Sequence, residues 1–343
     1  MDSRYLLIFL LLLPAVEGLV IGEEKPSLLD TVVITNEKWP DCIAAVEYAH
    51  QRGGVILQTP SDHLDPTVES LIEAIAPKKI VIVGGPLAVS YDVEERLKNY
   101  GNVVRIWGPT RVETREEILK KLDKKEELVL VDGTNFKDVV EVISWGYSPL
   151  YCFINIYDPE EVVRVYRDDG TVELYYFKGR KLIGRYPRQY VLEMPGKILV
   201  LSRCPDMDVE FTNNRYIAKF GYKLLSGKGT SLDSPCGYVV GVKEDTPSAV
   251  LLSKYLGLPV VYTPGGLSDR RVISFEQDPV NSSITVAVDI LVLKRTVELY
   301  RSSGDLKQSL YEAKTQLWSK NIPVERYNIP YSCLERYVEE KLK

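Results

Sequence analysis

Short apolar runs alternate with helical stretches from residue 31 to residue 122, and this alternation constrains the possible folds more than any other feature of the chain. Turn residues such as Gly53-Gly54 separate the runs from the helices. A strand that is apolar along its whole length is buried on both faces, so the pattern predicts a parallel sheet covered by helices on both sides. The expected strands are residues 32–35, 55–57, 79–83 and 103–107, and the expected helices are 41–51, 67–76, 90–98 and 113–122.

The strand–helix–strand opening of this unit recurs twice further along the chain. A strand at 128–131 and another at 238–240 each lead into a helix. Any α/β protein repeats strand, turn and helix, but similar turn chemistry with equal spacing favours true repeats. We therefore predict an α/β fold of three pseudo-repeated Rossmann-like units with parallel sheets. The spacing from the start of the helix to the next proline is the same in both later copies, Asp138 to Pro149 and Ser248 to Pro259.

A β-hairpin insertion is expected in the second unit, at about residues 156–196. Asp169-Gly170 has the composition of a hairpin turn between two strands, and residues 181–186 add a third strand. Residues 195–201 repeat the pattern of residues 77–83, so we predict that they form the equivalent strand of the second unit.

The chain ends in a predicted helical tail. Two amphipathic helices are expected there, broken near Pro323 and Pro330. The predicted division of the chain is 30–125 for the first unit, 126–235 for the second, 236–300 for the third and 301–343 for the tail.

The N-terminus has the pattern of a secretory signal peptide. Arg4 precedes an apolar run at residues 5–13, and small residues follow up to Gly18. The run is shorter than the roughly 20 residues that span a bilayer, so we predict export with removal of residues 1–18. Asp2 weakens the positive charge before the run, and a retained N-terminal anchor is the alternative. In both cases the protein is expected to be secreted or held at the cell surface, peripheral to the membrane.

Charge and cysteine content exclude several classes of protein. The net charge is −5, whereas a nucleic-acid-binding protein needs a clustered basic surface, so no nucleic-acid partner is predicted. The five cysteines include no Cys-x-x-Cys pair and the two histidines lie in no cluster, so neither a metal nor a cofactor is predicted. One or two disulfides can form in an oxidising compartment, and buried free thiols are the alternative.

Three motifs follow one another in residues 31–122. Asn36-Glu37-Lys38-Trp39-Pro40-Asp41 opens a helix, Ile82-Val83-Gly84-Gly85-Pro86-Leu87-Ala88-Val89-Ser90 follows a strand, and an Arg-x-x-Gly-x-x-Arg-x-x-Thr pattern runs from Arg105 to Thr114. In this order and at these separations, the motifs resemble the cell-wall-binding repeat 2 family. The chain departs from the family at Asn36, where the family tends to have Gly, and at Val55, where it tends to have Pro.

The resemblance implies a fold and a function. Members of the family arrange three α/β units around a common axis and attach exported proteins non-covalently to anionic cell-wall polymers. The second and third units of this chain match the family only at their openings, since neither carries the Gly-Gly step or the Arg-x-x-Gly-x-x-Arg end. If the family's binding surface needs three intact copies, that function is in doubt here.

Gly84 and Gly85 are candidate ligand-binding residues. Glycines between a strand and a helix let backbone N–H groups face a ligand, and the N-terminus of a helix favours an anion. As a nucleotide-binding motif the sequence is weak, because it lacks both Gly-x-Gly-x-x-Gly and Gly-Lys-(Ser/Thr). The alternative is a tight turn with Ser90 as the N-cap of the following helix. Asp41 and Asp138 are expected to cap the helices that they open.

Arg105 and Arg111 are the second pair of candidates. The planar guanidinium group suits a phosphate or carboxylate on a polymer. The alternative is an internal ion pair with Glu113 or Glu117. In the insertion, Tyr175 and Arg185 are candidate contacts for a sugar or an anionic polymer, although solvated edge strands carry the same residue types.

The sequence as a whole favours a non-enzymatic, exported surface protein that binds an anionic cell-envelope polymer or glycan, with no catalytic residues. One alternative is a hydrolase or transferase that acts on envelope material, supported only by an α/β scaffold whose strand ends suit ligands. The other is a receptor for a small ligand. Acids, His or Ser converging in one pocket would favour the enzyme, and a broad groove with Arg and Tyr would favour polymer binding.

Overall fold

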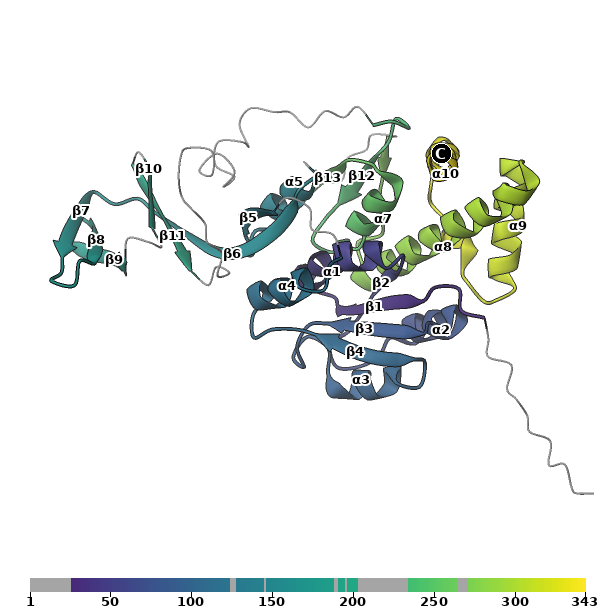
Figure 1. The fold of residues 1–343 in the computed structure, drawn as a ribbon, viewed down its shortest axis with the longest axis horizontal. Coiled ribbons are helices and arrows are strands. Elements are labelled where there is room, and N and C mark those ends of the chain that lie inside the picture. Colours follow the sequence, from purple (N-terminus) through teal and green to yellow (C-terminus); the bar gives the residue numbers. More distant parts are fainter. Residues whose placement is uncertain are drawn as a thin grey trace, which may run out of the picture.

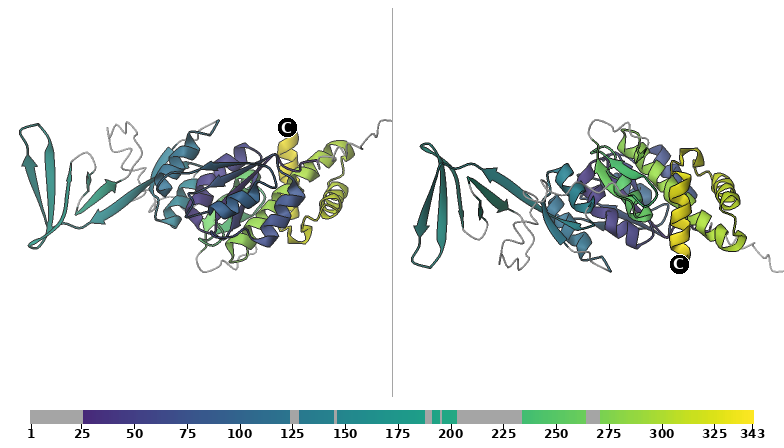
Figure 2. Two further views of the ribbon diagram at one scale, coloured as in Figure 1. Left: turned by 90° about the horizontal axis from the view of Figure 1, so that it is seen from below. Right: turned by 90° about the horizontal axis from the view of Figure 1, so that it is seen from above.

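The protein consists of an α/β body and a small β-sheet that projects from it, which makes the molecule elongated (Figures 1 and 2). The computed structural model describes residues 26–123, 128–144, 146–187, 191–194, 196–202, 234–263 and 271–343. The predicted signal peptide, residues 1–18, lies outside the described residues. Among the residues that the structure describes, no helix is both long and apolar enough to cross a bilayer.

The first sheet is parallel, as predicted. Its strand order is β2-β1-β3-β4, and Val33 of β1 lies opposite Ile56 of β2 and Val81 of β3. The two central strands, β1 and β3, are buried along almost their whole length, which explains their continuous apolar sequence. The strands are β1 (Thr31–Asn36), β2 (Val55–Thr59), β3 (Lys79–Val83) and β4 (Asn102–Ile106).

The helices of the first unit begin where the sequence provides caps. The side chains of Asp65, Ser90 and Thr110 accept hydrogen bonds from backbone N–H groups in the first turns of α2, α3 and α4. The predicted cap at Ser90 is therefore confirmed. The helices are α1 (Trp39–Gln51), α2 (Pro66–Ile75), α3 (Tyr91–Leu97) and α4 (Arg111–Leu119).

The second unit opens with a parallel strand pair but continues as a mixed sheet. Strands β5 (Leu128–Asp132) and β6 (Ser148–Tyr157) are parallel and are joined through α5 (Phe136–Ser144). Strand β11 (Lys197–Ser202) pairs antiparallel with β6 and with β10 (Val191–Met194). The predicted equivalence of residues 195–201 with residues 77–83 is therefore wrong. The short link between β10 and β11 permits only a hairpin, because a parallel pair needs a long crossover.

The third unit opens with a small parallel sheet of order β13-β12-β14. Strands β12 (Val239–Val242) and β13 (Val260–Tyr262) flank α7 (Ala249–Leu256), and β14 (Val272–Ile273) is very short. All three units thus share a parallel strand–helix–strand opening, and the α/β class is confirmed.

The predicted hairpin insertion is confirmed as a three-stranded antiparallel sheet. It consists of β7 (Glu161–Tyr166), β8 (Val172–Lys178) and β9 (Lys181–Pro187). Gly170 has a φ of +82°, which explains the glycine in the first turn. Leu174 and Tyr176 pack against residues of β11 in a small core of their own.

The C-terminal region is helical, as predicted. Its elements are α8 (Pro279–Ser303), α9 (Leu306–Trp318), the 3₁₀ turn η2 (Val324–Arg326) and α10 (Tyr331–Leu342). The long helix α8 packs against β2 of the first sheet and belongs to the body, so the predicted boundary at residue 300 falls inside it. A disulfide joins Cys236 to Cys333 of α10, whereas Cys42 is a buried free thiol.

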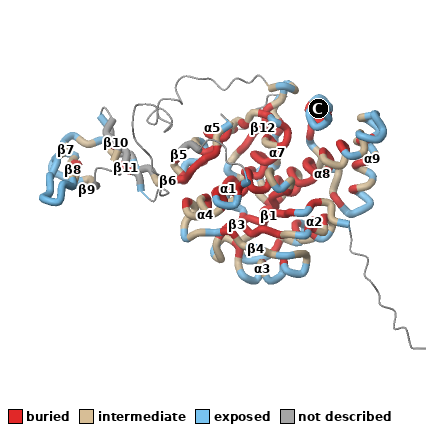
Figure 3. The backbone as a smooth tube through the Cα atoms, in the orientation of Figure 1, coloured by how far each residue is buried: buried red, intermediate tan, exposed pale blue. Residues whose placement is uncertain are grey.

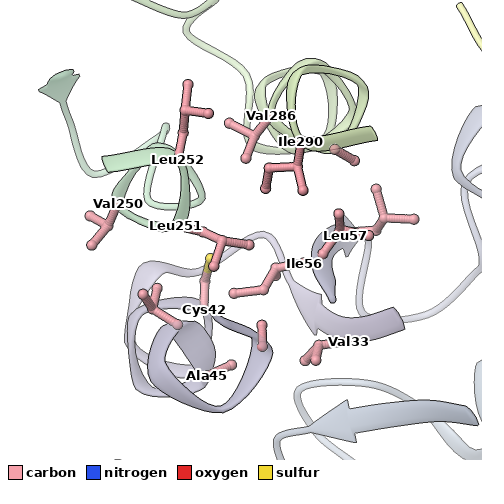
Figure 4. Packing of buried hydrophobic residues seen from close by; sticks show 14 of the residues in the cluster. Val33, Cys42, Ala45, Ile56, Leu57, Val250, Leu251, Leu252, Val286 and Ile290 are labelled. Atoms are coloured by element: carbon pink, nitrogen blue, oxygen red, sulfur yellow. The ribbon is translucent and has the colours of Figure 1, made fainter. Parts of the chain in front are cut away.

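One large core holds the body together. Figure 3 shows that burial is concentrated in β1, β3, α1, α7 and α8, whereas the projecting sheet is mostly exposed. Cys42 of α1, Ile56 of β2, Leu251 of α7 and Ile290 of α8 meet in this core with almost no exposed surface (Figure 4). Each such aliphatic side chain contributes about 1.5–3 kcal/mol through burial, so the three units are expected to depend on one another for stability.

Candidate functional site

The three motif-bearing turns of the first unit meet at the carboxyl edge of its sheet. They enclose a hollow of about 280 Å³, which we call the edge hollow. The carboxyl edge of a parallel sheet is where α/β proteins bind ligands, because loops and helix N-termini converge there. The lining residues come from segments 36–41, 85–88 and 107–114.

Gly85 lines the edge hollow, and Gly84, next to it in the chain, does not; both glycines approach other residues closely. Gly84 has a φ of +120°, and a Cβ there would lie 2.7 Å from a carboxylate oxygen of Asp41. A Cβ on Gly85 would lie 2.9 Å from the Trp107 ring. Both contacts exclude any other residue, so the Gly-Gly step allows an acid and an indole ring to approach the turn.

Asp41 is a desolvated carboxylate in the lining of the edge hollow. It lies in the first turn of α1, but the helix has no side-chain capping hydrogen bond, so the predicted capping role is not observed. Burial raises the pKa of Asp41 to about 6, and the nearby Arg111 charge lowers it only in part. The predicted cap at Asp138 is not observed either, because Asn135 caps α5: its side-chain oxygen accepts the Asp138 backbone N–H, while the Asp138 carboxylate accepts from the Asn135 side-chain amide.

Arg111 lines the edge hollow and also joins the first unit to the second. Its Nη1 donates a hydrogen bond of 2.9 Å to the carbonyl oxygen of Gly133. The guanidinium carbon lies 5.7 Å from the centre of the Trp39 ring, within the range of a cation–π contact. Trp39 in turn packs edge-on against Phe136 of α5. Arg111 is thus held in place by the second unit, with its charge at the rim of the hollow.

Arg105 does not line the edge hollow, but it contacts the β3–α3 turn beside it. Its Nε and Nη2 donate to a carboxylate oxygen of Glu94 at 2.9 and 2.7 Å, and its Nη1 donates to the carbonyl oxygen of Gly84 at 2.8 Å. The partner of Arg105 is thus Glu94 of α3, and not Glu113 or Glu117. By bonding Gly84 and Glu94 together, Arg105 fixes the β3–α3 turn.

The remaining residues of the Arg-x-x-Gly-x-x-Arg-x-x-Thr pattern shape the turn before α4. A Cβ on Gly108 would lie 2.4 Å from the Cβ of Glu113, so only glycine allows this approach. The Gly108 N–H donates to Thr114 Oγ1 at 3.0 Å. Thr110 and Glu113 form a capping box, in which the Glu113 carboxylate accepts from the Thr110 N–H at 3.0 Å. The pattern therefore encodes a rigid loop.

Two apolar side chains stand exposed at the edge hollow beside a cation. Leu87 is 99% exposed and Trp107 is 45% exposed. Lys38 is exposed in the same lining. An exposed indole ring next to positive charges can stack on a sugar ring while the cations meet acidic groups.

Sequence comparison finds proteins that share part of this chain, although no family model matches it. The chain is 32% identical over 123 residues to the amidase enhancer of Bacillus subtilis and 28% identical over 137 residues to the N-acetylmuramoyl-L-alanine amidase LytC of that organism. The two matches cover 36% and 38% of this chain but only 17% and 28% of the relatives. An uncharacterised protein of Pyrococcus horikoshii is 31% identical over 93 residues, which are 26% of this chain and 28% of that protein. The chain thus spans less than a third of the length of these relatives.

Two solved structures are also similar to this chain. Cwp8 from Clostridium difficile has a TM-score of 0.45 at 17% identity, covering 77% of this chain and 48% of that one. Cwp6 from the same organism has a TM-score of 0.34 at 23% identity, covering 36% of this chain and 21% of that one. Likeness at this level concerns the arrangement of the chain alone. Membership of the cell-wall-binding repeat 2 family stays a prediction.

Tyr175 and Arg185 do not belong to the edge hollow. They lie opposite each other on β8 and β9 of the projecting sheet, and the Arg185 guanidinium carbon is 5.2 Å from the centre of the Tyr175 ring. Glu173 accepts hydrogen bonds from both Arg185 and Arg167. Hydrogen bonds from these two arginines lower the pKa of Glu173 to about 2. The predicted candidate Arg185 is therefore paired with Glu173 on the surface of its own sheet.

Sequence reasoning missed the buried ion pair of Arg115 and Glu47. Arg115 Nη2 donates to a carboxylate oxygen of Glu47 at 2.5 Å and to Ser148 Oγ at 2.6 Å, and neither charged side chain is more than 8% exposed. Burial by itself raises the pKa of Glu47, but Arg115 and the Ser148 hydroxyl lower it below its ordinary value. A charge among the apolar and small residues 42–49 was the available signal. Among the described residues, no group of acids, His and Cys could hold a metal ion.

Proposed function

We propose that the protein is a non-enzymatic protein of the cell envelope that binds an anionic envelope polymer or glycan through the edge hollow. The observation that carries the proposal is the combination of Arg111 and Lys38 with the exposed ring of Trp107 in one lining. Cations attract the acidic groups of such a polymer, and the indole ring offers a flat face to its sugars. The protein would be secreted or held at the cell surface.

The relatives support a role in the envelope. One of them is named as an amidase of N-acetylmuramoyl-L-alanine and another as an amidase enhancer, and this chain resembles a minor part of each. Partial matches to both an amidase and a protein named for enhancing one fit a binding module better than a catalytic one. Tyr175 and Arg185 of the projecting sheet are proposed as a secondary contact with the same polymer.

The composition of the lining also favours binding over cleavage. Asp41 is the sole carboxylate among the described residues that line the edge hollow, and no Ser, Cys or His is among them. Most glycoside hydrolases flank the scissile bond with two carboxylates, and other hydrolases use a nucleophile with an adjacent base. The described lining of the edge hollow holds neither a pair of carboxylates nor a Ser or Cys nucleophile with an adjacent His.

Charge-reversing the exposed cation of the lining tests the proposal. Lys38→Glu should weaken binding of the full chain to purified anionic envelope polymer on the order of tenfold, a change of about 1.4 kcal/mol. Lys120→Glu, an equal change of charge at an exposed residue paired with Glu117, is the matched control. Trp107→Ala should weaken binding without lowering the melting temperature. If the hollow has a purely structural role, the variant should instead have a lower melting temperature and unchanged binding.

Salt and pH provide a second readout of the same proposal. Binding should weaken as salt rises, because charges near a surface are screened over about 10 Å at 0.1 M salt. It should strengthen as pH falls through about 6, where Asp41 becomes protonated and stops repelling an anion. Asp41→Asn should remove this pH step. Unchanged binding in Lys38→Glu and Trp107→Ala, with no effect of salt, would rule out the edge hollow as the polymer site.

A further inference from the structure

A second hollow lies at the opposite edge of the first sheet, where the described chain begins. It has a volume of about 440 Å³, and we call it the tail hollow. Residues 26–28, just before β1, form one wall, and helices α8 and α9 form the others. The edge hollow adjoins Asn36 at the carboxyl end of β1, so the two hollows lie at opposite ends of that strand.

The lining of the tail hollow has an excess of positive charge. Lys294, Arg295 and Lys320 face a single carboxylate, that of Glu298. Arg295 donates to Gln316 at 2.6 and 2.8 Å and to Glu298 at 2.6 Å. Glu298 thus pairs directly with Arg295, and among the described residues neither Lys294 nor Lys320 forms a salt bridge in this hollow.

Lys294 is the inner of these two lysines. Its ammonium group donates one hydrogen bond, 2.7 Å long, to the carbonyl oxygen of Gly53. An ammonium group has three donors, so two remain for a ligand. Burial lowers the pKa of Lys294, and the charges of Glu298 and Asp30 raise it only in part. An anionic group in the hollow would stabilise the charged lysine further.

Exposed aromatic side chains extend along α9 next to the hollow. Trp318, between the lining residues Leu317 and Ser319, is 68% exposed, and Tyr311 is 73% exposed. The two are seven residues apart, so they lie on the same face of α9, about 10 Å from each other. Tyr and Trp are enriched where a protein meets the headgroup layer of a membrane, because one end of each ring is apolar and the other polar.

The N-terminal segment connects to the body at this same end. Pro26, the first described residue, lines the tail hollow together with residues of α8 and α9. Twelve residues, 14–25, separate Pro26 from the apolar run at 5–13. If residues 1–18 are retained as an anchor, which is the alternative to cleavage, these twelve residues span at most about 40 Å, so the membrane would lie within reach of the hollow.

We propose that this end of the molecule docks on a membrane surface, with the phosphate of an anionic lipid headgroup in the tail hollow and Trp318 in the headgroup layer. Lys294 and Lys320 attract the phosphate. The hydroxyl groups of Ser27 and Ser319, also in the lining, donate to the carbonyl oxygens of Leu29 and Gln316, so the lysines supply the hydrogen bonds to the phosphate. The apolar floor of Leu28, Leu291 and Leu317 faces the glycerol and the first methylene groups.

Vesicle binding by the full chain tests this proposal. The double variant Trp318→Ala/Lys320→Glu changes two exposed residues at the tail hollow. Tyr166→Ala/Lys181→Glu is the matched control, because it makes the same changes at exposed residues of the projecting sheet. Both variants keep the N-terminal segment, so any contribution from that segment cancels. Neither variant alters the edge hollow, so the result is independent of the proposed polymer binding.

The expected result is selective loss of binding to anionic vesicles. Wild type and control should bind vesicles of phosphatidylcholine with phosphatidylglycerol more tightly than phosphatidylcholine alone. The tail-hollow variant should bind the anionic vesicles on the order of tenfold more weakly, since each basic residue near an anionic surface contributes substantially to the free energy of membrane binding. Ser319→Glu, which places a carboxylate in the lining, should give the same loss. Equal vesicle binding by the target and control variants would overturn the proposal. So would stabilisation of the protein by inorganic phosphate without any preference for anionic vesicles, because that outcome indicates a site for a free anion.

Discussion

At the residue scale, Asp289 shows how far burial can move a protonation equilibrium. The side chain lies on α8 with no exposed surface, and one carboxylate oxygen accepts the Asn328 N–H at 2.7 Å. The other oxygen has no hydrogen-bond partner. Burial raises the pKa of Asp289 to about 8, and the Asn328 hydrogen bond and the Lys314 charge lower it only in part. The folded protein therefore keeps Asp289 protonated at neutral pH.

The raised pKa predicts that stability depends on pH. The unfolded chain releases the Asp289 proton near its ordinary pKa of 3.8, whereas the folded chain keeps it up to about 8. The contribution is thus fully present below pH 4 and is lost as pH rises towards 8. When the pH rises from 5 to 7, the unfolding free energy of wild type should fall by about 2–3 kcal/mol more than that of Asp289→Asn. Denaturant titrations at the two pH values measure the difference. Parallel losses in the two proteins would show that Asp289 is already ionised in the fold.

At the scale of elements, the buried pair of Arg115 and Glu47 fastens three of them together. Arg115 belongs to α4 and Glu47 to α1, and Arg115 also donates to Ser148 and to the carbonyl oxygen of Pro149 on β6. A buried pair gains little over apolar packing, but removing one partner leaves an uncompensated buried charge. The pair therefore determines which helix faces which strand between the first and second units.

Arg115→Met should destabilise the protein by about 3–5 kcal/mol, because Glu47 would keep its charge in a dry site. The double variant Arg115→Met/Glu47→Met should recover a large part of this loss. Arg96→Met breaks the pair with Glu69 on the surface and should cost about 0–1 kcal/mol. Equal losses of unfolding free energy in Arg115→Met and Arg96→Met would show that the buried pair stabilises the fold no more than a surface pair does. Unfolding in denaturant measures all three.

The elements differ in how well the sequence predicts them. Strands β1 and β3 could be predicted because continuous apolar runs between turn residues leave few alternatives. The direction of β11 relative to β6 could not, since an apolar run fits a parallel or an antiparallel neighbour and does not itself show which it will have. In the site, the sequence indicated Gly84, Gly85 and Arg111. It could not show that Arg105 pairs with Glu94, because that contact depends on how α3 packs beside β4.

At the scale of the whole molecule, the two ends differ in character. The projecting sheet of β7, β8 and β9 lies at one end, and α9 lies at the other (Figures 1 and 2). If the tail hollow meets a membrane, the projecting sheet points away from it. The elongated shape would then allow one end to contact the membrane while the other reaches envelope material.

The disulfide between Cys236 and Cys333 holds α10 to the start of the third unit, and its removal is the last prediction. It closes a loop of 97 residues, and in the chain-entropy model such a loop stabilises the fold by about 4–5 kcal/mol. Cys236→Ala/Cys333→Ala should therefore lower the unfolding free energy by up to this amount. Variants are preferable to a reducing agent, because Cys152 also lies in a disulfide.

Packing of α10 supplies the competing explanation for its position. Leu334, Tyr337 and Val338 are buried against the body, so α10 can stay docked without the disulfide. In that case the double variant should unfold in a single transition at lower denaturant concentration, with a slope no shallower than that of wild type, because the unfolded chain without the cross-link exposes at least as much surface. An earlier separate transition would instead show that α10 detaches first. A loss below about 1 kcal/mol would contradict the entropic estimate and assign the docking of α10 to its apolar face.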